Sequence, residues 1–214
     1  GSTLGSGELL NISSVLQTAL GAKNYGKSKE FEDTMEEDSL SHYFDSLEPL
    51  SFVRKEIERC IIGDNEFSDD ASPTLKSIRR SINNTNSKIH EQLSKIMATA
   101  NNKNFLQDNL ITLRNGRYCL PVKQEYRSNI PGMVHDQSST GSTVFIEPMA
   151  VIKLNNEIKE LSLKEQEEIE KILAVLSNLV AENADIIEAD FDILESLDFI
   201  FAKGLLSKNM KASE

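Results

Sequence analysis

Tryptophan is absent from this 214-residue chain, and aromatic residues make up only 6% of it. Charged residues reach 27%, a balance more typical of long exposed helices than of a compact β-sandwich. The two cysteines, Cys60 and Cys119, form neither a metal-binding pattern nor a disulfide framework. No apolar run reaches the ~18 residues of a membrane helix, and the opening residues lack the regions of a signal peptide. We therefore expect a cytoplasmic protein with no membrane partner.

The net charge of −11 argues against a general nucleic-acid binder, because phosphate contacts depend on a positive surface. The three histidines, His42, His90 and His135, are scattered without the spacing of metal ligands. The sequence thus predicts no metal site and no cofactor in this chain.

Two segments, 75–100 and 151–179, carry the same irregular spacing of apolar positions when one is read backwards. From Leu75 to Ala100 the steps are 3, 4, 3, 4, 4, 3, 4, and they are the same from Leu179 back to Leu154. Such a seam is typical of helices packed knobs-into-holes, and the doubled 4 is a stutter. Matching stutters predict two antiparallel helices, with Glu165 as a polar layer. The expected facing pairs are Leu75–Leu179, Thr85–Ile169, Ile89–Glu165 and Ala100–Leu154.

Residues between these helices read as strands and turns, which predicts a mainly α fold with a long antiparallel helical arm and a small antiparallel β module at its tip. We expect an N-terminal helical region over 1–65, with a loop at 21–38. Arm and core helices are expected over 66–104 and 147–214, and the β insert over 105–146. Apolar periodicity places further helices at 7–20, 39–62 and 186–206, with a break at Pro49 and a helix start at Ser72-Pro73.

Residues Gly21–Ser28, GAKNYGKS, match the phosphate-loop pattern GxxxxGK[ST]. That loop works only between a buried strand and a helix, where backbone amides cradle phosphates. Here an amphipathic helix is expected before it, and the acidic run at 29–38 would repel a triphosphate. We expect a coincidental match that binds no nucleotide.

Hydrolytic chemistry is also not expected. His135 and Asp136 are adjacent on a predicted strand and so point to opposite faces, where they cannot easily act as base and orienting acid. No glycine-flanked nucleophile elbow is present. The sequence predicts no catalytic residue.

Asn115-Gly116 is a strong two-residue hairpin signal, because both residues tolerate positive φ. The turn would place Arg114 opposite Arg117, Leu113 opposite Tyr118 and Ile111 opposite Leu120. Pro121 suggests an edge strand, and further strands are expected at 133–137 and 143–146. Alternation predicts an inward face of Ile111, Leu113, Tyr118, Leu120 and Val122. The opposite face, with the arginines in solvent, is Thr112, Arg114, Arg117, Cys119 and Lys123.

Two arginines directly opposite each other need an external anion or a nearby carboxylate. The alternative to an anion site is a solvated face of mixed charge. The functional interpretation is contact with a phosphate backbone. The candidate nucleic-acid-binding residues are Arg114, Arg117, Lys123, Arg127, His135 and Gln137.

The motifs LRNGRYCLPVK, VHDQSSTGSTVFIEP and LNNEI, with DDASPTLKSIRRSI before them and LDFIFAKGLL after them, closely resemble the second bacterial MutS family. This family comprises recombination-suppressing, ribosome-associated MutS paralogues. The resemblance covers residues 69–206 and is weaker before that. Departures are small: Gly204 stands where alanine is frequent, and Cys119 where an aliphatic residue is common.

The resemblance implies core and lever helices with a clamp, belonging to a homodimer whose arms embrace a nucleic acid. Branched DNA and the rRNA of stalled ribosomes are both implied partners, in suppression of recombination or in ribosome quality control, and the residues do not separate them. The ATPase, with its ATP and magnesium, and the small MutS-related endonuclease domain would lie outside this chain. We therefore expect no enzyme activity and no small-molecule substrate here. The alternative is a purely structural dimer-assembly module without ligand contact.

Overall fold

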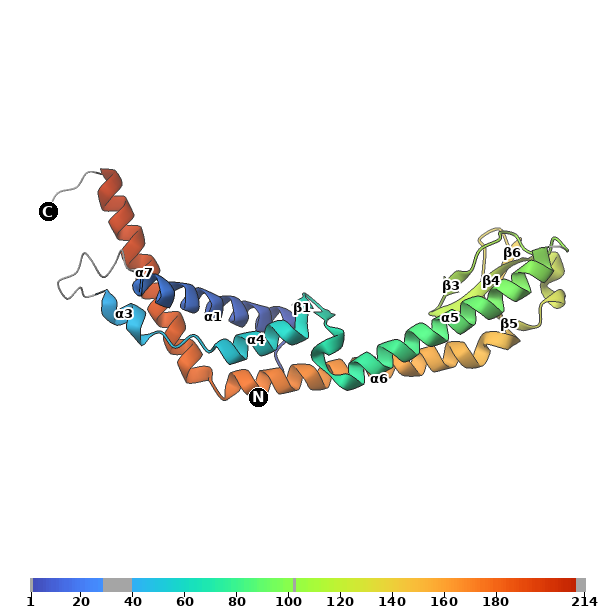
Figure 1. Cartoon of the computed structure of the whole chain (residues 1–214). Helices are drawn as coiled ribbons and strands as arrows, with labels where there is room; N and C mark the ends of the chain where they lie inside the picture. The colour runs from blue at the N-terminus through green and yellow to red at the C-terminus, as the bar shows by residue number, and fades with distance from the viewer. Residues whose placement is uncertain (1, 29–39, 102, 211–214) are drawn as a thin grey trace. The chain divides into compact units, whose positions relative to one another are not determined.

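The computed structural model describes residues 2–28, 40–101 and 103–210 (Figure 1). It is mainly helical with small antiparallel sheets, which confirms the expected fold class. The chain forms two compact units. The first, named the helical unit, comprises residues 1–72 and 169–214, and the second, the sheet unit, comprises residues 73–168. The finer domain boundaries expected from the sequence stay a prediction.

In the helical unit, α1 packs against α4, α7 and α3. Helix α1 runs beyond Gly21, so the expected helix end before this glycine is wrong. A glycine inside a helix costs only about 1 kcal/mol relative to alanine, and the packing of α1 against its neighbours offsets that cost. The break at Pro49 is confirmed, because α3 and α4 end and begin on either side of it. The elements are α1 (Ser6–Gly26), α3 (Ser41–Ser46), α4 (Ser51–Cys60), β1 (Ile61–Gly63), β2 (Glu66–Phe67), η1 (Asp69–Ala71) and α7 (Ala184–Met210).

Helix α5 (Pro73–Asn101) begins at the expected proline, and α6 spans Ile152–Ala181. Within the sheet unit the two helices are antiparallel, as expected. Arg79 Nε lies 2.7 Å from Glu165 Oε1, and the Thr85 hydroxyl donates to Glu157 at 3.1 Å. The expected register is wrong, because Glu165 lies opposite Arg79 and not opposite Ile89.

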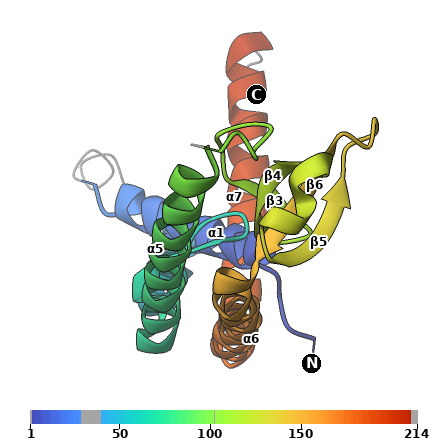
Figure 2. The ribbon, with the colours of Figure 1, turned by 90° about the vertical axis from the view of Figure 1, so that its right-hand side faces the viewer.

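The last turns of α5 explain the shifted register. Ile89 and Leu93, in the second half of α5, belong to a buried core cluster that also contains Leu120 of the sheet. Figure 2 shows α5, α6 and the sheet of this unit. A seam matched from end to end assumes that both helices pair throughout. From Ile89 onward the α5 stripe instead packs against the sheet as well as the start of α6, so α6 pairs with earlier turns of α5 than the seam predicts.

The sheet has the order β3-β4-β6-β5, with all neighbours antiparallel. The hairpin pairing is confirmed, since Arg114 lies opposite Arg117 and Leu113 opposite Tyr118. Asn115 (φ 51°) and Gly116 (φ 73°) are both left-handed, which a type I′ turn requires. The strands are β3 (Thr112–Arg114), β4 (Arg117–Lys123), β5 (Gly132–Gln137) and β6 (Thr143–Pro148), and η2 (Gln124–Asn129) and η3 (Met149–Val151) follow β4 and β6.

Pro121 does not lie on an edge strand, because β4 has neighbours on both sides. It pairs with Phe145 of β6, and on the other side its carbonyl accepts from the Gln107 amide at 2.9 Å. Amide and carbonyl of a strand residue point to the same side, so the missing proline N–H faces the irregular segment at Gln107 and leaves the β6 ladder intact. A proline is therefore tolerated inside this sheet.

The expected division of the hairpin into a solvent face and an inward face is only partly right. Leu120 is fully buried and Tyr118 partly buried, as expected. Cys119 is also fully buried, whereas Leu113 is 57% exposed. Strand β4 is covered on both faces, and β3 is an edge strand with a neighbour on one side only. The face that carries Arg114 and Arg117 is therefore not a free solvent face.

Candidate nucleic-acid interface

Arg117 is held by residues of the chain itself. Its Nη1 lies 2.8 Å from Glu147 Oε1, and its Nη2 donates to the Asn156 side chain at 2.7 Å. The Glu147 side chain has no exposed surface, and that of Arg117 is 23% exposed. This arginine is therefore partly withdrawn from solvent and already neutralised.

Asn155, in the first turn of α6, completes the surroundings of Glu147. Its amide nitrogen donates to Glu147 Oε1 at 2.7 Å, and its oxygen accepts from the Tyr118 backbone N–H at 3.1 Å. The same amide nitrogen lies 3.3 Å from the Tyr118 carbonyl. One asparagine side chain thus joins α6 to strand β4 much as a neighbouring strand would.

Glu147 stays ionised despite its burial. Burial opposes ionisation, but hydrogen bonds from Asn155, His135 and Arg117 outweigh it and hold the pKa of Glu147 below its ordinary value. His135 Nε2 lies 2.5 Å from Glu147 Oε2, and the His135 carbonyl accepts from the Asn115 side chain. His135 is therefore a structural partner of Glu147.

Arg114 also has an internal partner. Its Nε lies 3.2 Å from Asp136 Oδ2, and its guanidinium stands 3.9 Å from the centre of the Phe145 ring. Both expected phosphate ligands of the hairpin are thus paired with carboxylates. From the sequence, this arginine pair was expected to need either an external anion or a nearby carboxylate, and the structure shows nearby carboxylates.

The remaining candidates lie apart from this network. Lys123 Nζ donates to the Asn104 side chain, and the Gln137 side chain donates to the Gly141 carbonyl. Arg127, on η2, is exposed. The structure therefore brings Arg114, Arg117 and His135 together and leaves Lys123, Arg127 and Gln137 outside.

Sequence reasoning missed the residues that organise this network, which are Glu147, Asn155 and Asn156. One signal could have found Glu147. A carboxylate in a strand that pairs next to a two-arginine hairpin is the expected counter-ion of that hairpin.

Charge is divided between the two units. The sheet unit carries thirteen lysines and arginines against ten aspartates and glutamates, whereas the helical unit carries ten against twenty-four. The net charge of −11 therefore combines a positive sheet unit with a strongly negative helical unit. The acidity of the whole chain says little about the surface of the sheet unit.

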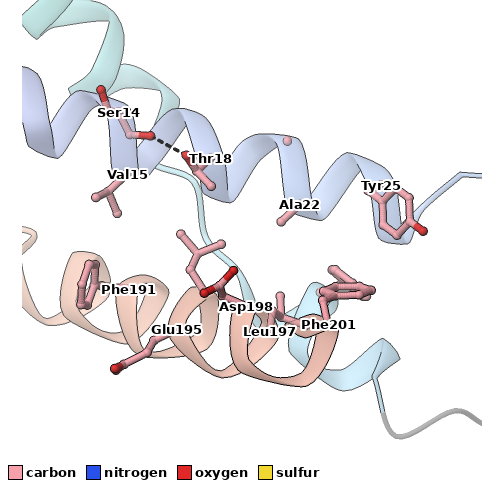
Figure 3. Close-up of a pocket in the computed structure, with 13 residues that line it drawn as sticks. Ser14, Val15, Thr18, Ala22, Tyr25, Phe191, Glu195, Leu197, Asp198 and Phe201 are labelled. Atoms are coloured by element: carbon pink, nitrogen blue, oxygen red, sulfur yellow. Dashed lines mark hydrogen bonds between the residues drawn. The ribbon is translucent and has the colours of Figure 1, made fainter. Parts of the chain in front are cut away.

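The helical unit contains a groove of about 820 Å³ between α1 and α7 (Figure 3). Tyr25, Phe191 and Phe201 line it together with Glu195 and Asp198, and Figure 3 shows the Asp198 carboxylate on the side of α7 that faces α1. No lysine or arginine is among the described residues that line it. Such a groove is unsuited to a phosphate ligand.

The phosphate-loop pattern at Gly21–Ser28 lies partly on the wall of this groove. Gly21–Gly26 are the last residues of α1, and a helix, not a strand, precedes the pattern. A phosphate loop requires a strand directly before it, and here helix α1 stands in that place. This part of the expectation is therefore confirmed. The acidic run at 29–38 lies outside the described residues.

Within residues 2–28, 40–101 and 103–210, no group of three or more His, Cys, Asp or Glu side chains is arranged to hold a metal ion. Across the same ranges no helix has both the length and the hydropathy needed to cross a bilayer.

Comparison with known proteins gives extensive similarity. The chain is 59% identical over its full length to the endonuclease MutS2 of Lachnoclostridium phytofermentans and 56% identical over 98% of its length to that of Agathobacter rectalis. It is 50% identical over its full length to the endonuclease MutS2 of Lachnospira eligens. The chain spans about a quarter of the length of these curated relatives, 26–27%. No family model matches it.

Proposed function

The chain belongs to the MutS2 family, and from this premise we propose that it is a non-catalytic clamp and lever region that contacts nucleic acid through its sheet unit. Branched DNA or the RNA of a stalled ribosome is the ligand, in suppression of recombination or in ribosome rescue. The ATP-driven and nucleolytic steps belong to other parts of the whole protein, which acts as a homodimer.

The division of charge is the observation that carries this proposal. A phosphate backbone is attracted by lysine and arginine and repelled by carboxylates, so it favours the sheet unit over the helical unit. Arg127 is exposed, and Lys123 is half-buried with a neutral asparagine as its partner. These two cations replace the paired hairpin arginines as the first phosphate ligands to test.

Anisotropy titrations of the 214-residue chain test the proposal. The ligands are a labelled four-way DNA junction, a matched duplex and a structured rRNA fragment, each at several salt concentrations. The Lys123→Glu, Arg127→Glu double variant should bind more weakly, with a salt slope for duplex DNA lower by one or two, since each phosphate contact contributes ~0.9. The matched control is Lys203→Glu with Lys208→Glu in α7, which also reverses two positive charges, here on exposed lysines, and should keep the wild-type affinity.

Absence of binding to all three ligands at low salt would overturn the proposal. Equal losses in both double variants would show a general charge effect without an interface. A stronger loss on rRNA than on the junction, or the reverse, identifies the preferred ligand.

One observation favours a second candidate function, a dimer-assembly module. Large apolar side chains are exposed near the end of α7, including Phe199 (60%), Leu205 (62%) and Leu206 (59%). Exposed apolar patches mark interaction surfaces. Sedimentation analysis of the chain with and without Leu205→Glu checks this function: a dimer that the variant dissociates supports it, and a wild-type monomer at all concentrations contradicts it.

A further inference from the structure

The sheet unit contains a cleft of about 500 Å³ that the hairpin network does not use. One wall is the C-terminal part of α5, from Gln92 to Ala100. The other walls are the segment between η2 and β5, around Ile130, and the end of β6 with η3, around Met149. A backbone hydrogen bond from Met149 to Pro131 (3.0 Å) ties these last two walls together. The volume lies within the usual range for small-ligand sites.

We call the apolar part of the lining the floor of the cleft, and it includes an aromatic ring. Ile96, Phe105 and Ile130 line it. The Phe105 ring centre lies 4.9 Å from that of Tyr126 with an interplanar angle of 35°, so a neighbouring ring supports its orientation. Met149 also lines the cleft and is 67% exposed. A long flexible side chain of this kind adapts to the shape of a bound ring.

Cations stand beside this apolar floor. Lys95 and Lys103 both line the cleft, and none of the described residues that line it carries a carboxylate. Lys103 Nζ lies 5.9 Å from the centre of the Phe105 ring. Lys95 pairs with Glu91 at 2.6 Å, but both side chains are more than 60% exposed, so this pair yields readily to a phosphate.

Neutral hydrogen-bonding groups complete the lining. Gln92 and Asn129 bring side-chain amides, and Thr99 brings a hydroxyl. An amide offers a donor and an acceptor together, which suits the edge of a nucleobase. A flat ring over an apolar floor, polar groups at its edge and a phosphate beside two lysines together describe a nucleotide.

We propose that this cleft receives one unpaired nucleobase of a bound nucleic-acid strand, with the adjacent phosphate at Lys95 and Lys103. In a duplex the bases are stacked and paired, so only a flap, bulge, junction or single strand presents such a base. The proposal rests on the proposed function and deepens it, because it makes the sheet unit selective for unpaired nucleotides. The acidic groove of the helical unit offers no such partner for phosphate.

Filling the cleft provides a sharp test. Thr99→Trp adds a large ring from an exposed helical position that lines the cleft. Ala98→Trp is the matched control, because Ala98 is an exposed neighbour on the same helix and does not line the cleft. Thermal unfolding followed by circular dichroism establishes that both variants remain folded.

The probes are a duplex of about 20 base pairs, the same duplex with a single-stranded flap containing 2-aminopurine, and AMP as a free nucleotide. We expect the wild type and Ala98→Trp to bind the flap about tenfold more tightly than the duplex, as stacking of one base allows. The 2-aminopurine fluorescence should fall on binding. Thr99→Trp should bind both DNA probes with the duplex affinity and leave the fluorescence unchanged.

Each other outcome has a definite meaning. Equal wild-type affinity for duplex and flap refutes the base cleft and leaves phosphate contact by the sheet unit intact. Absence of binding to both DNA probes refutes the cleft and the DNA form of the proposed function, whose rRNA form is decided by the titration with the rRNA fragment. Flap preference that survives in folded Thr99→Trp places the base elsewhere and refutes the cleft. If AMP displaces the flap DNA from the wild type, the cleft binds free nucleotides, and the proposal that it receives a base of a nucleic-acid strand is wrong.

Discussion

The guanidinium of Arg117 lies 2.8 Å from the carboxylate of Glu147, which connects the tip of the β3–β4 hairpin to the far end of β6. Because Glu147 is fully buried, it depends on its partners for the solvation that water would otherwise provide. The pair therefore belongs to the packing of the sheet unit.

Replacing Arg117 by alanine should destabilise the sheet unit by about 1–3 kcal/mol, because the buried Glu147 carboxylate loses its arginine partner. His135 and Asn155 still hydrogen-bond Glu147, which limits the loss. Arg114→Ala is the matched control, because its pair with Asp136 is more than a third exposed and contributes at most about 1 kcal/mol. Urea unfolding followed by circular dichroism measures both, and equal effects would contradict the distinction.

Two opposite arginines destabilise a hairpin only while no carboxylate lies beside them, and here each arginine has one. The hairpin itself was predictable, because Asn115-Gly116 determines the turn and the turn determines which residues face each other. The counter-ions were harder to predict, because Glu147 and Asp136 become recognisable as partners only once their strands are placed beside the hairpin, and that pairing depends on the whole sheet.

The helical arm shows the same limit. Its existence, its antiparallel sense and its start at Pro73 follow from local spacing and capping. Its register does not, because an apolar stripe specifies that a face is buried and leaves open whether a helix or a sheet covers it. The stripe of α5 contacts both: Thr85 hydrogen-bonds Glu157 of α6, and Ile89 belongs to the core cluster that includes the sheet.

The candidate site was predictable as a kind of surface, positive and on the β module. Its particular residues were not. The motif residues Arg114, Arg117 and His135 stand out in the sequence, yet their side chains pair with carboxylates of the same unit. The exposed Arg127 lies in a short 3₁₀ segment without any pattern of its own.

Glu147 should make the stability of the sheet unit fall with acid. Its folded-state pKa is lower than in the unfolded chain, where a glutamate titrates near ~4.3. The stabilisation is therefore fully present above that value and is lost as the pH falls through the lowered folded pKa. Unfolding free energies at successive pH values below about 5 measure the slope. Glu147→Gln should be less stable at neutral pH and should show a smaller acid slope; an unchanged slope would contradict the assignment.

Replacing Asn155 by aspartate should destabilise the sheet unit at neutral pH and reverse the pH trend. The change removes the donor to Glu147 and places a second carboxylate where the amide nitrogen now lies, 2.7 Å from Glu147 Oε1. Like charges raise the pKa of the pair, so protonation on acidification relieves the repulsion and recovers part of the lost stability. Asn155→Ala, which lacks the extra charge, should show no such recovery. Parallel pH series of both variants decide the matter.

The register of the arm predicts which residue is energetically coupled to Glu165. A double-mutant cycle on Arg79 and Glu165 should give a coupling of about 0.5–1 kcal/mol, because the charged atoms are 2.7 Å apart and both side chains are about one-quarter exposed. The register expected from the apolar seam places Glu165 beside Ile89, ten residues and about 15 Å further along the helix. In that register Lys88, an exposed cation next to Ile89, would couple instead. A second cycle on Lys88 and Glu165 should therefore give no coupling beyond ~0.3 kcal/mol, the additivity of distant sites. The reverse result, with Lys88 coupled to Glu165 and Arg79 independent of it, would support the register expected from the apolar seam. It would also contradict the conclusion that the sheet packs on the second half of α5.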